Sequence, residues 1–344
     1  MATRDRSAIR VSSPADLVEA VPYLLGFHPT ESLVVIGLAE SGSSVRQVEV
    51  TARLDLAPSG VDEPALDSLL RVLSGAAEAA AVLVHTDTIA GDPHAVHWLT
   101  DLVERLTVRL AALDIALVDA LMVNSANWWS LSCSGNGCCP TTGTSRRPQS
   151  SLVAAEATFA GLVALPDRLA LQASLAGEPD ELRAVLTPAL GRAGSRLTEL
   201  IGRNGRQHTV RLERAAVMKA AADCQGGTRL SDRRLVRIGA ALGMLEVRDA
   251  VWLAIDDRSL DASQLLGQLH SRLPGRHRAA PLFLLGWQQW RAGNATLAGM
   301  AAAAALRADP GYSAARLLNE AVELGMDPRR TPPLTAGRGH RLPA

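Results

Sequence analysis

The sequence predicts an α/β domain with a mixed sheet, followed by an all-α domain of helical hairpins. Up to about residue 145, short apolar runs of strand length alternate with stretches of helical periodicity. From residue 151 the strand patterns disappear, and helical periodicity continues to about residue 326. The length agrees with this division, since 344 residues of which 47% are hydrophobic form about two domains.

The first domain, residues 1–145, begins with an apolar run that ends in glycine, as expected of a buried strand. A β-rich run follows after a Ser-Gly-Ser turn, which favours a hairpin. Leucines at spacings of three and four then predict helices, each followed by another apolar strand. The expected strands are 32–37, 45–56, 81–85, 117–123 and 128–132, and the expected helices are 64–80 and 93–110.

The second domain, residues 151–326, consists of helices separated by proline and glycine. Residues 282–307 are expected to form an antiparallel helical hairpin, with Gly286 and Ala305 where the helices approach most closely. The spacing of small and apolar residues from Leu282 to Pro310 resembles one tetratricopeptide repeat, although such units need about three copies to be stable. The proline- and glycine-rich residues 327–344 predict a disordered tail.

A cluster of three cysteines in a glycine-rich loop is the most distinctive feature of the chain. Cys133, Cys138 and Cys139 follow the last expected strand. They are interpreted in three ways: as inert thiols, as a redox or nucleophilic thiol at Cys138 or Cys139, or as metal ligands. A zinc site would need a fourth ligand from His28, or alternatively from His85, His94 or His97, although the spacing is not that of a zinc knuckle or ribbon.

Two histidines are candidates for catalysis or binding. His85 and Asp87 stand at the carboxyl end of an expected strand, which is the edge where open α/β sheets bind ligands. His28 precedes the first strand and is a candidate base or metal ligand. A histidine in such a position more often ties down a turn, so the structural interpretation stays open.

Composition argues against several classes of function. The charged amino terminus lacks the apolar stretch of a signal peptide, and no run reaches the roughly 20 apolar residues of a membrane span. We therefore expect a cytoplasmic protein. The basic stretch 192–248 has no interleaved aromatic residues and no recognised DNA-binding motif, which makes nucleic acid an unlikely partner.

Two segments resemble a family of bacterial proteins. Residues 13–17 (SPADL), 21–29 (VPYLLGFHP) and 32–37 (SLVVIG) look like its opening, and Trp128-Trp129-Ser130 with the cysteine loop looks like a second signature. The family is the domain-of-unknown-function family four-one-nine-two. The resemblance implies no activity, cofactor or catalytic residue.

Two functions from different classes follow. The first is a ligand- or protein-binding adaptor whose helical domain offers a tetratricopeptide-like groove to a protein partner. The second is an enzyme in which the cysteine loop acts with His28, or with His85 and Asp87, at the sheet edge. They differ in whether the histidines and the cysteine loop meet in one pocket.

Overall fold

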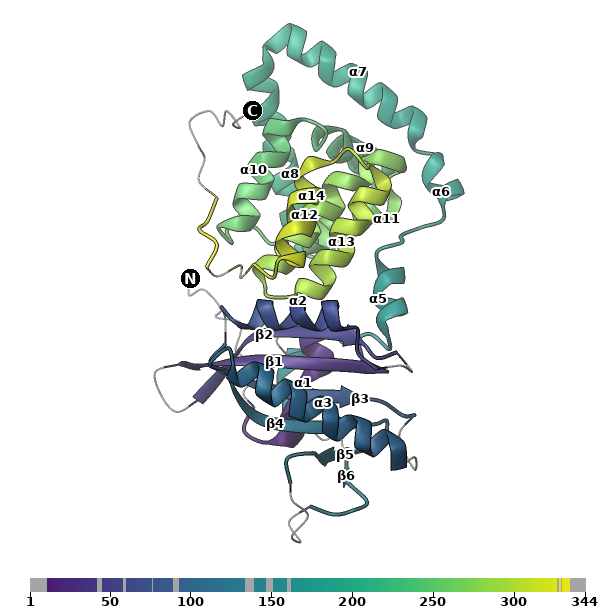
Figure 1. Ribbon diagram of the computed structural model, residues 1–344. Helices are drawn as coiled ribbons and strands as arrows, with labels where there is room; N and C mark the ends of the chain where they lie inside the picture. Colours follow the sequence, from purple (N-terminus) through teal and green to yellow (C-terminus); the bar gives the residue numbers. More distant parts are fainter. Residues whose placement is uncertain are drawn as a thin grey trace. The chain divides into compact units, whose positions relative to one another are not determined.

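The computed structural model contains two compact units, residues 1–171 and 172–344 (Figure 1). Each unit has its own hydrophobic core. The structure describes residues 11–41, 45–57, 60–75, 77–88, 93–133, 139–146, 151–159, 162–326, 328 and 330–334.

The first unit is built on a six-stranded mixed sheet of order β2-β1-β3-β4-β5-β6, which confirms the predicted fold class. Only the pair β3 and β4 is parallel, and the other neighbours are antiparallel. Gly37 in β1 has no space for a side chain, because a Cβ there would lie 2.6 Å from Val50 Cγ1. The strands are β1 Ser32–Ser41, β2 Val45–Asp55, β3 Ala79–His85, β4 Ala116–Val123, β5 Asn127–Ser130 and β6 Thr144–Ser145.

One face of the sheet packs on helices α2 (Glu63–Leu73) and α3 (Pro93–Ala111), whose leucines form a common core with β1 and β3. The helix predicted over 64–80 was too long. Ala79 and Ala80 instead pair with Leu38 and Gly37 of β1, because sheet pairing overrides the helix propensity of alanine.

Helix α1 (Pro14–Leu25) was missed by the sequence analysis, although its signals were present. The side chain of Ser13 accepts a hydrogen bond from the Asp16 amide at 3.2 Å, and Pro14 occupies the first helical turn. Gly26 ends the helix with a left-handed φ of 82°. Helix α4 (Leu152–Phe159) packs against α1.

The second unit is helical, and described residues after Ser145 form no strand. Helix α5 (Arg168–Ser174) crosses the division between the units. The remaining helices are α6 Asp180–Ala184, α7 Thr187–Asn204, α8 Arg206–Gln225, α9 Asp232–Ala241, α10 Leu245–Asp256, α11 Ser263–Arg272, the 3-10 helix η2 Gly275–Arg278, α12 Ala279–Arg291, α13 Ala295–Ala308 and α14 Ser313–Glu323.

The predicted hairpin over 282–307 corresponds to α12 and α13, which pack on each other. A Cβ at Gly286 would lie 3.1 Å from the Ala298 carbonyl oxygen and 3.2 Å from Ala301 Cβ. The small residues on α13 therefore permit this close approach. Among the described residues, we find no helix whose length and hydropathy would let it span a membrane.

Candidate functional site

The carboxyl ends of β3 and β4 lie beside the start of β1. We call this end of the strands the edge of the sheet. His85, the last residue of β3, pairs with Ser32 on one side and with Val123 on the other. Residues opposite each other in an antiparallel pair point to the same face, so Ser32 and His85 share a face. This face is opposite the one that packs on α2 and α3.

His85 is buried without a complete set of hydrogen bonds. His85 is 4% exposed, and its Nε2 has no hydrogen-bond partner among the described residues. Burial, together with the charges of Arg146 and Arg53 and the nearby His28, lowers the pKa of His85 to about 3. The imidazole is therefore neutral at physiological pH, and its Nε2 is a buried atom without a hydrogen bond among the described residues.

Two arginines from distant parts of the chain reach this edge. Arg53 in β2 donates from Nε to Ser32 Oγ at 2.9 Å and stacks over the Phe27 ring. Arg146, just after β6, donates from Nε to the buried Glu19 of α1 at 3.2 Å and from a terminal nitrogen to the Asn124 carbonyl oxygen at 3.3 Å. The sequence analysis did not identify Arg53 or Glu19 as site residues, since a lone charge in a strand or helix carries no motif.

His28 lies at the same edge, so the structure brings the two candidate histidines together. Its side chain is exposed, and its amide donates to the Leu165 carbonyl oxygen at 2.9 Å. Partial burial and the Arg146 charge lower the pKa of His28, against the opposing effect of Glu19. The backbone contact agrees with a residue that fixes the turn before β1.

Asp87 connects the loop after β3 to the loop after β4. Its carboxylate accepts from the Ser125 amide at 2.9 Å. Its own amide donates to Glu31, whose carboxylate also accepts from the Thr86 and Thr88 hydroxyls at 2.9 and 2.8 Å. Glu31 has a left-handed φ of 39°, a strained conformation for a residue other than glycine, and these donors hold it in place.

The cysteine loop begins away from this edge. Strand β5 is antiparallel to β4, with Ser130 opposite Leu121. The chain therefore runs away from the His85–Val123 pair as it continues from β5 to Cys133. It returns to the edge at β6. Trp129 Nε1 donates to the Thr141 carbonyl oxygen at 3.2 Å, which fixes the returning part.

Cys133 and Cys139 are half-buried, and Cys138 lies outside the described residues. In the part of the chain that is described, no group of three His, Cys, Asp or Glu side chains is arranged to hold a metal ion. The interpretation of Cys133, Cys138, Cys139 and His28 as zinc ligands, one of three for this loop, therefore remains a prediction. Cys224 is a buried thiol of the second unit, and burial raises its pKa.

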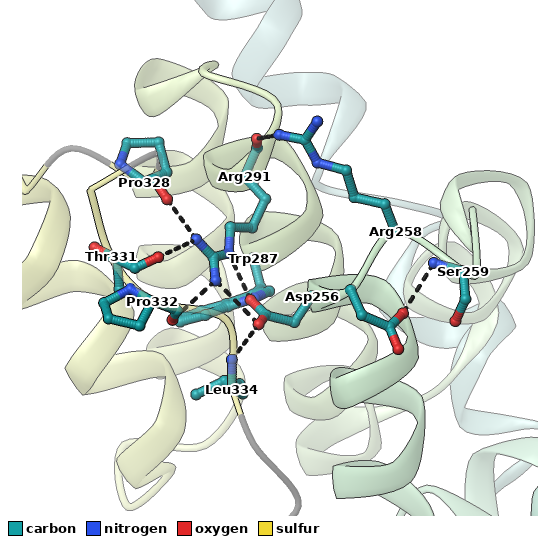
Figure 2. Close-up of polar contacts among 10 residues, drawn as sticks. Asp256, Arg258, Ser259, Trp287, Arg291, Pro328, Thr331, Pro332 and Leu334 are labelled. Atoms are coloured by element: carbon teal, nitrogen blue, oxygen red, sulfur yellow. Dashed lines mark hydrogen bonds and ion pairs between the residues drawn. The ribbon is translucent and has the colours of Figure 1, made fainter. Parts of the chain in front are cut away.

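A second polar site, in the helical unit, involves residues that the sequence analysis did not select. Asp256 ends α10, and its side chain is fully buried. It accepts from Trp287 Nε1 at 2.8 Å and pairs with the Arg291 guanidinium, which donates from both Nε and a terminal nitrogen (Figure 2). We call Asp256 and Arg291 the main-chain clamp.

The clamp holds Pro328 and the stretch 330–334 through backbone groups. Arg291 donates to the carbonyl oxygens of Pro328, of Thr331 at 2.9 Å and of Pro332 at 3.2 Å, while Asp256 accepts from the Leu334 amide (Figure 2). Burial would raise the pKa of Asp256, but hydrogen bonds from Arg291, Leu334 and Trp287 outweigh it, so that the pKa is lowered. These contacts give a defined place to described residues of the segment expected to be a disordered tail.

The fold and these sites define a two-part protein, with an α/β unit that has a buried polar edge and a helical unit that contacts the backbone of Pro328, Thr331, Pro332 and Leu334. The chain belongs to a family described as "Domain of unknown function (DUF4192)", whose model matches residues 14–329. This match bears out the resemblance of the opening segments. No curated protein and no solved structure matches the chain.

Proposed function

We propose that this protein is a binding or adaptor protein whose helical unit holds a proline-containing segment of a protein partner. The observation that carries the proposal is the main-chain clamp. Its bonds to the chain's own residues 331–334 go to backbone carbonyl and amide groups, so the clamp recognises backbone groups rather than particular side chains.

The chemistry of the bound segment indicates the class of partner. Pro332 and Pro333 fix φ near −65° and favour an extended conformation, so less conformational entropy is lost on binding. Residues 332–334 form neither helix nor strand. Leu334 adds a hydrophobic contact with the helical core. A partner with an extended proline-containing stretch followed by an apolar residue fits this site.

The order of the helices supports the proposal. Helices α10, α12 and α14 begin at residues 245, 279 and 313, which is the 34-residue period of tetratricopeptide repeats. Asp256 and Arg291 come from α10 and α12, the first helices of two successive units at this period. Proteins of this kind use their stacked helices as binding surfaces for partners.

The test uses a chain that ends at Met326 and a synthetic peptide with the sequence of residues 327–340. We expect saturable binding, followed through the fluorescence of Trp287, which contacts Asp256, and Trp290. Arg291→Gln should weaken binding at least about tenfold, because hydrogen bonds from a charged group each contribute about 1.5–3 kcal/mol. Arg211→Gln, an exposed arginine on α8, is the matched control.

A change in the peptide keeps the test valid if the arginine variant does not fold. N-methylation of the leucine that corresponds to Leu334 removes the amide that donates to Asp256 and should weaken binding. Absence of binding by the unmodified peptide to the shortened chain contradicts the proposal.

An enzyme with a thiol or metal site is the alternative function. It is favoured by the neutral, buried His85 with its unpartnered ring nitrogen at the carboxyl edge of β3. Elemental analysis of the purified protein tests the zinc form of this hypothesis. Stoichiometric zinc that is lost in Cys138→Ser would support it, and a metal-free protein with slowly alkylated cysteines would contradict it.

A further inference from the structure

A cluster of positive charges lies where α6, the end of α11 and η2 come together. Arg183 donates to the Ala176 carbonyl oxygen at 2.7 Å, and Arg278 donates to the same oxygen at 2.6 Å. Arg278 also donates from Nε to the His270 carbonyl oxygen at 2.7 Å. The two guanidinium groups therefore share one carbonyl acceptor, and the His270 ring lies close enough to both for their charges to lower its pKa.

Two buried nitrogen atoms in this cluster lack hydrogen-bond partners. The Arg183 side chain is 7% exposed, yet its Nε has no partner among the described residues. His270 is 4% exposed, and its Nδ1 also has none in that part of the chain. A buried polar atom without a partner costs free energy, so native proteins rarely leave two together.

The charges of the cluster are unbalanced. Arg183 pairs with Asp180, whose side chain is exposed, and Arg307 adds a further positive charge near Arg278. Burial, followed by the charges of Arg183 and Arg307, lowers the pKa of Arg278 to about 10 although Asp180 opposes this effect. Burial and the same two guanidinium groups, Arg278 before Arg183, lower the pKa of His270 to about 4.

We propose that this cluster is a binding site for a small oxyanion of the phosphate type. Arg183 Nε and His270 Nδ1, the latter in the tautomer that carries its proton there, would donate to the oxyanion. The adjacent guanidinium groups would neutralise its charge. Guanidinium groups suit this ligand because their planar arrangement of donors matches phosphate oxygens.

The opposing interpretation is a structural one. Arg278 also donates to the Leu175 carbonyl oxygen at 2.9 Å, so the arginines already satisfy carbonyl groups that follow α5. Cations at a helix carboxyl end are favourable without any ligand. In that case phosphate would change the Tm only through its ionic strength. A specific effect of phosphate therefore distinguishes an oxyanion site from the structural interpretation.

The experiment compares inorganic phosphate with sodium chloride at equal ionic strength, using the full-length chain. Phosphate should raise the Tm and should raise the pKa of the His270 ring measured by NMR, because a bound anion favours the charged imidazole. Calorimetric titration should show that Arg183→Gln increases the Kd for phosphate at least about tenfold. Arg276→Gln, which alters an exposed arginine of η2, should leave this Kd unchanged.

His270→Gln provides a second variant if Arg183→Gln does not fold, and it should also weaken phosphate binding. The proposal is overturned if phosphate and chloride give the same Tm and the same His270 pKa in the wild-type chain. It is equally overturned if Arg276→Gln weakens binding as much as Arg183→Gln, since the effect would then be nonspecific.

Discussion

At the scale of the residue, buried polar side chains carry most of the information about function. His85, Asp256 and Arg183 are buried and lie in three separate polar clusters. Asp256 is fully satisfied by Trp287, Arg291 and the segment that it holds, whereas His85 and Arg183 retain unpartnered nitrogen atoms. Asp256 therefore has no hydrogen-bonding capacity left, whereas His85 and Arg183 each keep a buried nitrogen atom whose desolvation is not offset by a hydrogen bond.

The first prediction concerns His85 and pH. Its pKa falls from 6.5 in the unfolded chain to about 3 in the folded one, so the unfolded state binds more protons between these values. Stability should therefore decrease as the pH falls from 6.5 toward 3. Between pH 6 and 5 most carboxylates stay ionised, so His85→Gln should reduce the slope of unfolding free energy against pH by up to about 1.4 kcal/mol per unit.

Urea denaturation at a series of pH values measures this slope. At pH 8 the imidazole is neutral in both states, so the difference between variant and wild type there gives the packing effect of the substitution alone. An unchanged slope in His85→Gln would show that His85 takes up a proton in the folded protein as readily as in the unfolded chain.

At the scale of the element, sequence patterns predicted strands well but misplaced boundaries. The apolar runs at residues 32–37 and 81–85 became β1 and β3, which are central in the sheet and buried on both faces. The helix expected over 64–80 ended at Leu73, because partners distant in sequence decide whether alanines join a strand. Helix α1 was missed although Ser13 marks its start.

The second prediction concerns the α12–α13 hairpin. Gly286→Leu should destabilise the helical unit by about 1–3 kcal/mol through overpacking, because a Cβ there already lies 3.0 Å from Leu318 Cδ2 and 3.1 Å from the Ala298 carbonyl oxygen. Gly267 in α11 provides the control, since a Cβ there meets no atom within 4 Å. Gly267→Ala should be neutral or stabilising by up to about 1 kcal/mol.

Thermal and urea denaturation distinguish the two glycine variants. Equal stability of Gly286→Leu and the wild type would show that the helices are not closely packed at residue 286. A destabilised Gly267→Ala would show that helix propensity does not control that position.

At the scale of the whole molecule, the fold class, a mixed sheet followed by helices, was predictable, but the sites were only partly so. The edge position of His85 followed from the strand pattern. Its neighbours Arg53 and Glu19 come from β2 and α1, and only tertiary packing brings them to the same edge as Arg146. The main-chain clamp was not predictable, because Asp256 and Arg291 are single charged residues on two helices and only tertiary packing brings their side chains together.

The last prediction is that the two units unfold separately. Each contains about 170 residues and its own hydrophobic core, which is the size of an independent domain. We therefore expect two calorimetric transitions.

Asp256→Asn leaves Arg291 buried without its charged partner, so it should destabilise the helical unit by about 3–5 kcal/mol and shift one transition alone. His85→Gln should shift the other, and exposed Asp257→Asn is the control for the aspartate variant. A single transition shifted by both Asp256→Asn and His85→Gln would mean that the units fold as one cooperative body.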